Sequence, residues 1–121
     1  MTEQLSFSRF EKEVLPNYRN RMNIAESTED VKKFFVYTAQ DFLVKVFNHE
    51  PRIEFEDIAL NPHQTPAYTL SSRIVNDRQF NEVIKRSDLP YILERLAGTA
   101  VKRYNRLERN PEKSDSKIRA K

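Results

Sequence analysis

One segment of the sequence constrains the fold more than any other, the stretch from Thr28 to Phe47. Apolar and small side chains recur in it at spacings of three and four and form one broad face. The residues on this face are Val31, Phe34, Phe35, Thr38, Ala39, Phe42, Leu43 and Val46. Since Val36, Tyr37 and Val44 make other sides apolar as well, the segment predicts a helix in the middle of a bundle.

A β-strand is the rival interpretation of this segment, because Phe, Val and Tyr are good strand formers. The helical spacing, however, persists from Val31 to Val46, which is longer than a typical strand. A helix start signal precedes it, with a hydroxyl at Ser27 and carboxylates at Glu29 and Asp30, where the helix dipole favours them. We therefore expect a helix over residues 28–47, with strand left open for part of it.

A first helix is predicted from about Ser8, because Ser8 and Glu11 match the spacing of a capping box. The apolar face of this helix consists of Phe7, Phe10, Val14, Tyr18 and Met22. Pro16 interrupts the pattern and lacks the N–H that a helix interior needs. We therefore expect a kink there, or two short helices that meet at Pro16.

The second half of the sequence predicts further helices. Two short ones are indicated by apolar residues at helical spacing, namely Leu70, Ile74 and Val75, and then Phe80, Val83 and Ile84. Residues 76–79 provide a capping signature for the second of them. Ser87 and Asp88 would cap a last helix, which should end at Asn110 because the residue before Pro111 disfavours helical backbone.

Between residues 48 and 66 the helical pattern stops and prolines interrupt the chain. Only residues 53–56 alternate between apolar and polar side chains, which indicates a short strand or an extended segment. We expect the apolar residues of this connection to dip into the core, namely Ile53, Phe55, Ile58 and Leu60. A connection of this length is unusual in a compact domain and is often functional.

Together these patterns predict a mainly α fold, a small bundle of four to five helices with at most one short strand pair in the 48–66 connection. A chain of 121 residues is short for more than one domain, so residues 1–110 would form a single helical domain. Residues 111–121 would form a disordered basic tail, because Ile118 is the only large apolar residue in them.

The composition excludes several classes of functional site. The chain has a single Gly, so it cannot build a glycine-rich phosphate loop or a nucleophile elbow. It has no Cys, which removes disulfides, thiolate nucleophiles and cysteine-ligated metal sites. No apolar stretch is long enough for a signal peptide or a membrane span, so we expect a cytoplasmic protein that does not bind membranes.

The histidines do not favour a metal or acid–base cluster. His49 and His63 are the only two, and both fall in the 48–66 connection near several carboxylates. A zinc site without Cys would require two His on one helix face, and these two share none. His49 also has no identifiable nucleophile beside it. We expect no cofactor, no metal and no catalytic residue, and an enzyme centred on His49 is the weakest of three functional hypotheses.

The charge is divided unevenly along the chain. Residues 1–94 carry 12 basic and 15 acidic side chains, whereas residues 95–121 carry 9 basic and 3 acidic ones. We predict a site for an anionic partner on the face of the last helix opposite its apolar stripe. The site continues into the tail and consists of Arg95, Lys102, Arg106, Arg109 and Lys113. The alternative is a solvated helix face, on which the helix dipole stabilises cations near the C-terminus.

Gly98 lies inside this last helix, where Gly costs about 1 kcal/mol relative to Ala. Its neighbours Ala97, Thr99 and Ala100 are also small and would let another backbone approach closely. Because Ala97 and Ala100 lie on the inward half of the helix, we expect a neighbouring helix of the core to make this approach. A partner on the basic side is the alternative.

Exposed apolar residues would form a second candidate site. A helix that is apolar on several sides needs more cover than three partners give, which would leave Val36, Tyr37, Phe47 and Phe55 as a protein-interaction surface unless the connection covers them. The predicted function is therefore a small non-enzymatic protein-interaction or adaptor module, with a protein partner or a second copy of the chain. The alternative is a nucleic-acid-binding regulator that uses the basic C-terminal helix and tail.

Overall fold

The computed structural model describes residues 5–48 and 50–109. The described part contains five α-helices, one turn of 3₁₀ helix and one antiparallel strand pair, which confirms the predicted mainly α class. The elements in chain order are α1 (Ser8–Ile24), α2 (Thr28–Phe47), η1 (Phe55–Asp57), β1 (Ile58–Leu60), β2 (Tyr68–Leu70), α3 (Ser72–Val75), α4 (Arg78–Lys85) and α5 (Leu89–Arg109).

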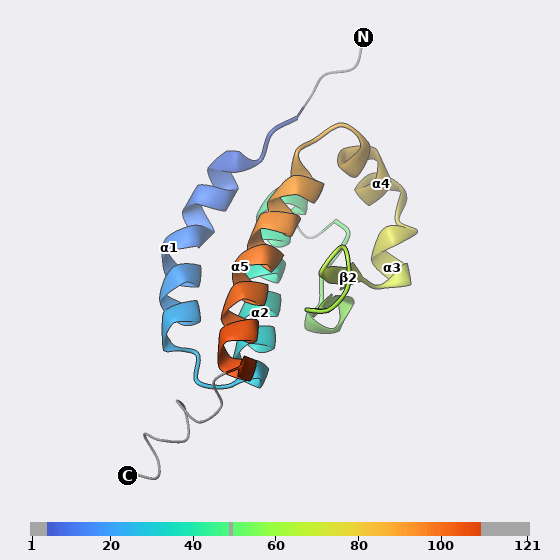
Figure 1. Ribbon diagram of the computed structural model, residues 1–121. Helices are drawn as coiled ribbons and strands as arrows, with labels where there is room; N and C mark the ends of the chain where they lie inside the picture. Colours follow the sequence, from blue (N-terminus) through green and yellow to red (C-terminus); the bar gives the residue numbers. More distant parts are fainter. Residues whose placement is uncertain (1–4, 49, 110–121) are drawn as a thin grey trace, which may run out of the picture.

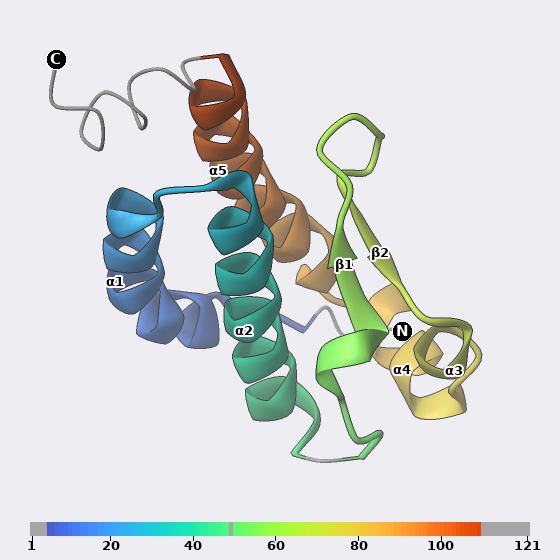
Figure 2. The same ribbon diagram turned by 90° about the horizontal axis from the view of Figure 1, so that it is seen from below.

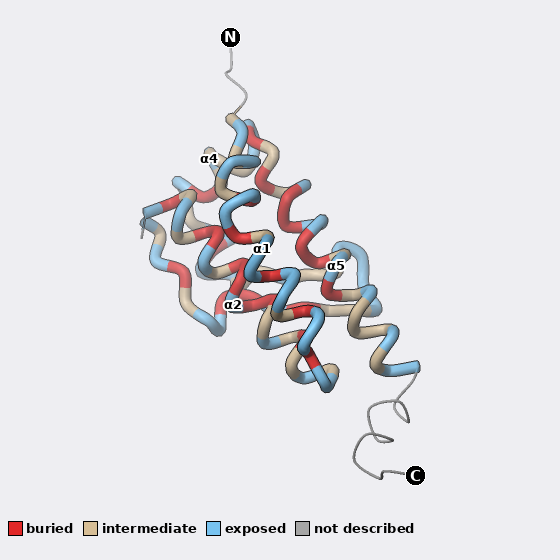
Figure 3. Tube along the Cα trace, turned by 90° about the vertical axis from the view of Figure 1, so that its left-hand side faces the viewer, coloured by how far each residue is buried: buried red, intermediate tan, exposed pale blue. Residues whose placement is uncertain are grey.

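Helix α2 lies in the middle of the fold, as its apolar pattern predicts. It packs against α1, α5 and β1, and Phe35, Ala39, Phe42 and Leu43 are fully buried in it. Figure 2 shows the β-hairpin on one side of α2 and α5, and α1 on the other side. Buried and exposed residues alternate along the helices, as amphipathic packing requires (Figure 3). The strand alternative for this segment is therefore wrong.

The two ends of α2 are set by local signals. The Ser27 hydroxyl accepts a hydrogen bond from the Asp30 amide at 3.1 Å, which satisfies one of the unpaired donors of the first turn. At the other end Asn48 adopts a left-handed backbone with φ of 50° and donates its amide to the Val44 carbonyl. Asn tolerates this conformation better than most residues, so the helix ends there.

The start of α1 is not held by the predicted capping box. Ser8 is the first helical residue, and the Asp88 carboxylate accepts the Phe7 amide at 2.8 Å and the Ser6 hydroxyl at 2.9 Å. Leu5 pairs with Ser87 in a parallel bridge beside these contacts. The cap of α1 therefore comes from the segment that precedes α5, which a local motif cannot reveal.

The expected division of the first helix at Pro16 is also absent. Helix α1 is continuous from Ser8 to Ile24, and Pro16 lies exposed within it. A proline on the solvent side leaves the unpaired carbonyl four residues earlier open to water, which lowers the penalty for the missing donor. The prediction of two short helices was wrong for this reason.

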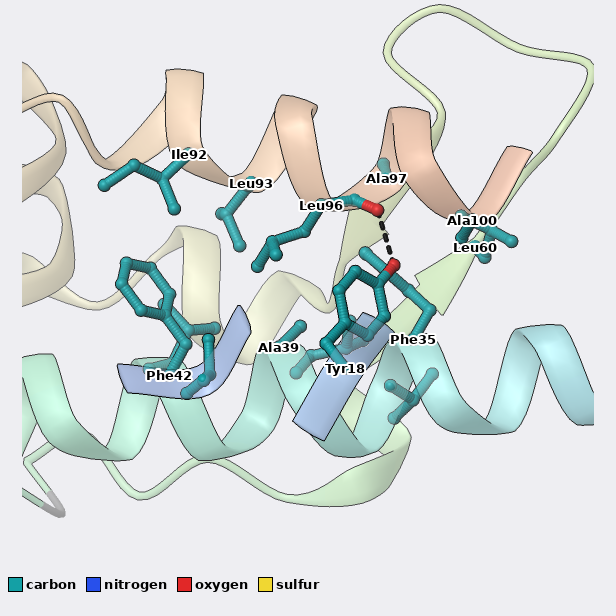
Figure 4. Packing of buried hydrophobic residues seen from close by; sticks show 14 of the residues in the cluster. Tyr18, Phe35, Ala39, Phe42, Leu60, Ile92, Leu93, Leu96, Ala97 and Ala100 are labelled. Atoms are coloured by element: carbon teal, nitrogen blue, oxygen red, sulfur yellow. Dashed lines mark hydrogen bonds between the residues drawn. The ribbon is translucent and has the colours of Figure 1, made fainter. Parts of the chain in front are cut away.

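Tyr18 joins α1 to α5 in the centre of the core. It is fully buried, and its hydroxyl donates to the Leu96 carbonyl at 2.5 Å (Figure 4). Burial raises the pKa of Tyr18 well above its usual value, so the side chain stays neutral. The ring fills the space between the helices while the hydroxyl meets a backbone acceptor, which is how a buried Tyr avoids an unsatisfied polar group.

The strand pair lies later in the chain than expected. Antiparallel pairing places Ile58 opposite Leu70 and Leu60 opposite Tyr68, so Leu70 belongs to β2 and not to a helix. Ile53, Ile58 and Leu60 are buried as predicted. Phe55 does not dip into the core, because residues 55–57 form a 3₁₀ turn that leaves its ring 39% exposed.

A buried carboxylate fixes the base of this hairpin. Asp57 accepts hydrogen bonds from the Ser71 hydroxyl at 2.6 Å and the Glu54 amide at 2.8 Å, and it forms an ion pair with Arg73. Burial alone would raise the pKa of Asp57, but these donors and the Arg73 charge outweigh it and the pKa lies below its usual value. The charged form of Asp57 therefore stabilises the folded state.

Local caps set the remaining helices. Ser71 caps α3 and Asp77 caps α4 through a 2.9 Å hydrogen bond from the Phe80 amide, which confirms the two short helices. The Ser87 hydroxyl accepts the Leu89 amide at 3.2 Å at the start of α5. Arg109 is the last helical residue described, one position before the predicted end, and the tail predicted over residues 111–121 lies outside the described residues.

Gly98 does not serve close packing inside the fold. A Cβ atom built at this position would meet no heavy atom within 4 Å. The expectation that a neighbouring helix approaches Gly98 is therefore wrong, although Ala97 and Ala100 are buried as predicted. The small inward residues pack the core, while Gly98 leaves an open position on the outer side.

Replacing Gly98 with Ala should stabilise the protein by about 1 kcal/mol, because Ala restricts the unfolded chain and fits the helix without a clash. Thermal unfolding followed by circular dichroism should show a melting temperature higher by about 3 to 6 °C. Asn105→Ala on the same helix is the control and should gain about half as much. A loss of stability in Gly98→Ala would contradict the open space seen at this position.

Replacing Asp57 with Asn should cost about 2 kcal/mol at pH 7, because Arg73 then loses its charged partner. Since the folded pKa is lowered, the contribution of Asp57 is present above the ordinary value of 3.8 and is lost as the pH falls through the folded pKa. Urea unfolding at several pH values should show the two proteins converging in acid. Glu56→Gln, an exposed neighbour, should match the parent throughout, and a difference independent of pH would refute the assignment.

Candidate functional site

The four residues predicted to form a protein-interaction surface separate into two pairs. Val36 and Phe47 are only 5% and 4% exposed, so their expected exposure was wrong. The Phe47 ring stacks on Phe80 of α4 with ring centroids 5.3 Å apart, and β1 packs against α2. The segment from η1 to α4 therefore covers the part of α2 that α1 and α5 leave uncovered.

Tyr37 and Phe55 form the exposed pair. Their rings lie 5.2 Å apart between centroids, and their exposed fractions are 42% and 39%. Gln40 holds the two segments together, because its side-chain amide donates to the Ile53 carbonyl at 3.0 Å. Two aromatic rings from α2 and η1 thus present one continuous apolar edge.

A groove of about 610 Å³ lies beside Tyr37, between α1 and α2. Its α1 side is lined by Glu13, Val14, Asn17 and Arg21, and its α2 side by Tyr37, Thr38, Gln40, Asp41, Val44 and Lys45. Positions four apart on a helix lie on one face, which puts the polar groups in two facing rows. The rows run in opposite directions because α1 and α2 are antiparallel.

The two ends of these rows are closed by contacts across the groove. At one end Lys45 Nζ lies 3.4 Å from Glu13 Oε1, and at the other the Arg21 guanidinium lies 5.9 Å from the centre of the Tyr37 ring. Between them Asn17 and Asp41 face the groove, and neither side chain forms a hydrogen bond or ion pair with any other described residue. The middle of the groove therefore offers one amide and one carboxylate to an occupant.

The predicted anionic-partner residues divide as well. Arg95 donates two hydrogen bonds to Glu11, from Nε at 3.0 Å and from Nη2 at 2.9 Å, and Glu11 is 8% exposed. These bonds raise the pKa of Arg95 and link α5 to α1. Arg95 was expected to be a free cation for an anionic partner, and it is instead paired with Glu11. Lys102, Arg106 and Arg109 are exposed, while Lys113 lies outside the described residues.

Arg103 holds the other end of α1, a role that the sequence analysis missed. Its Nη2 donates to the Ala25 carbonyl at 2.7 Å and to the Asn23 carbonyl at 3.4 Å. Asn23 lies in the last turn of α1 and Ala25 is its C-cap, so the cation satisfies carbonyls that have no helical partner. A signal was present in the sequence, since Arg103 lies seven residues after Leu96 and thus on the inward side of α5.

The histidines do not form a catalytic cluster in the part described. His63 is exposed, with Nε2 3.8 Å from Glu108 Oε1 and its ring against Tyr104, while His49 lies outside the described residues. Over residues 5–48 and 50–109 no group of three His, Cys, Asp or Glu side chains is placed to hold a metal ion. Every helix in the same ranges is too short or too polar to cross a bilayer.

Replacing Arg95 with Ala should destabilise the fold by about 1 to 2 kcal/mol, because it leaves the buried Glu11 carboxylate without its partner and Arg95 is itself half exposed. The change should appear as a lower urea midpoint. Lys102→Ala, an exposed cation on the same helix, is the control and should change stability by less than about 0.5 kcal/mol. Equal effects of both variants would show that the Glu11 pair contributes nothing.

Comparisons with known proteins found no relative of this chain. No protein-family model matches it, and neither a curated protein nor a solved structure matches it significantly.

Proposed function

We propose that this chain is a protein-interaction module that binds its partner in the groove between α1 and α2. The observation that carries the proposal is the groove of about 610 Å³ with the exposed Tyr37–Phe55 pair at its edge. A cleft of this size between two helices is large enough to receive side chains of a partner segment. Exposed aromatic rings beside such a cleft are the residue type that most often dominates binding energy at interfaces.

The chemistry of the groove defines the partner segment that fits it. Tyr37 and Phe55 offer an apolar edge, and Val14 and Val44 add apolar surface to the lining. Asp41 supplies a carboxylate that forms no ion pair or hydrogen bond with any described residue. A partner that presents an apolar side chain next to Lys or Arg would therefore match both features.

The composition of the lining supports binding over catalysis. The residues that line the groove include no His, Cys or Ser, so a nucleophile activated by a neighbouring imidazole is not among them. The charged groups at its two ends already contact Glu13 and Tyr37 across the groove. Such closed contacts give the groove a defined length, which suits recognition of a short segment.

Affinity purification with the double variant Tyr37→Ser/Phe55→Ser tests the proposal. A specific partner should be retained by the parent protein and lost from this variant, because the apolar edge is removed while both residues are exposed enough to change without unfolding the core. Ile24→Ser/Val75→Ser is the matched control, since these apolar residues are 68% and 41% exposed and lie outside the groove lining. A partner retained equally by both double variants would overturn the assignment of the groove.

Light scattering coupled to gel filtration decides whether the partner is a second copy of the chain. Self-association that disappears in Tyr37→Ser/Phe55→Ser would identify the groove as a homo-oligomer interface. A monomer at every concentration would exclude a second copy and leave a different protein as the occupant.

A further inference from the structure

The outward face of α5 carries a strip of residues that the fold does not use. Tyr91, Gly98, Lys102 and Arg109 are spaced seven, four and seven residues apart, which places them within about 40° of one another around the helix. Figure 1 shows α5 in front of α2, between α1 and the hairpin, with no other element in front of it. We call these four residues the α5 strip.

The side chains of the α5 strip have no partners within the described chain. Tyr91 is 62% exposed, and it forms no hydrogen bond or ring contact with any residue in the described ranges. Lys102 and Arg109 are exposed and likewise form no ion pair there. An aromatic ring and two cations thus stand free on one helix face.

Gly98 adds an independent feature to the strip. Nothing lies within 4 Å of the place where its Cβ would be, so no contact inside the chain requires a glycine. Glycine is nevertheless unfavourable in a helix interior. Its position between Tyr91 and Lys102 leaves a notch where the backbone of a ligand can lie directly against the helix.

The two acidic residues of α5 differ in their distance from the strip. Glu108 lies 3.8 Å from His63 of the hairpin loop and thus on the hairpin side of the helix. Glu94 lies three residues after Tyr91 and four before Gly98, so it borders the N-terminal half of the strip. The C-terminal half, with Lys102 and Arg109, carries positive charge only, which is complementary to a polyanion.

We propose that the α5 strip binds single-stranded nucleic acid. Lys102 and Arg109 contact phosphates, the Tyr91 ring stacks on a base, and Gly98 lets the sugar–phosphate backbone lie against the helix. An acidic protein surface would satisfy the cations, whereas a nucleic acid always brings a base next to its phosphates for the Tyr91 ring, so nucleic acid matches more of the strip. This surface lies on a different side of the fold from the α1–α2 groove and adds a second ligand to the proposed function.

The length of the strip fits a short stretch of single strand. At 1.5 Å per residue, Tyr91 and Arg109 lie about 27 Å apart along α5. Single-strand binding proteins cover about 4 to 16 nucleotides per site with the same combination of cations and aromatic rings. The strip offers one stacking position and two phosphate contacts along this length.

The proposal is tested by fluorescence anisotropy with the full chain and labelled single-stranded oligonucleotides of about 15 nucleotides, oligouridine RNA and oligothymidine DNA. Affinity for either should fall steeply as salt is raised. Lys102→Ala/Arg109→Ala should reduce the slope of log affinity against log salt by about 1.4. The control Lys33→Ala/Lys85→Ala has the same net charge, changes exposed cations of α2 and α4, and should leave the slope nearly unchanged.

Two further variants separate the strip from general charge attraction. Tyr91→Ala should weaken binding about fivefold or more, whereas Tyr91→Phe keeps the ring and should bind like the parent. Gly98→Ala should bind about threefold or more weakly although it is the more stable protein, so unfolding cannot explain the loss.

Several outcomes would overturn the proposal. These are no binding at about 50 mM salt, equal losses in the two double-cation variants, or Tyr91→Ala binding as tightly as the parent. Full competition by polyglutamate at matched charge would assign the strip to acidic proteins instead. Tyr37→Ser/Phe55→Ser should bind the oligonucleotides normally, so failure of either surface leaves the other proposal intact.

Discussion

The structure depends on the need to cover α2 on most of its circumference. Phe35, Phe42 and Leu43 are fully buried, and a single neighbouring helix could not cover all of them. Helices α1 and α5 and the hairpin therefore each cover one side of α2. This demand explains why the segment from η1 to α4 folds back over the bundle and does not remain an open loop. It also explains why the groove is lined by few apolar side chains, because most of the apolar surface of α2 is already buried against other elements.

The long helices are held in register by polar contacts that lie at successive levels of α1. Asp88 binds the residues just before the first turn, the Glu11–Arg95 pair lies in the first turn, Tyr18 in the middle and Arg103 at the end. Apolar packing alone tolerates sliding of one helix along another, whereas directional bonds of this kind do not. Tyr91, Lys102 and Arg109 of the α5 strip take no part in this scheme, and their side chains are exposed.

Local signals in the sequence predicted much of the fold, and long-range contacts account for what they missed. The helix over Thr28–Phe47 and its cap at Ser27 follow from neighbouring residues, so both could be predicted. The cover over Val36 and Phe47 could not, because it depends on how a distant segment folds back. In the candidate sites the exposed ring of Tyr37 was expected from its place on the helix, whereas the pairing of Arg95 with Glu11 could not be predicted, because the two residues lie 84 positions apart.

The cap of α1 has a consequence for the order in which the chain folds during synthesis. The Phe7 amide is satisfied by Asp88, which is 81 residues further along, so α1 is synthesised well before the residue that binds its first amide. Isolated helices of this length are marginal in water, and α1 also contains a proline. The first turn of α1 therefore reaches its full stability only when the segment before α5 is in place, which couples the first helix to the second half of the domain.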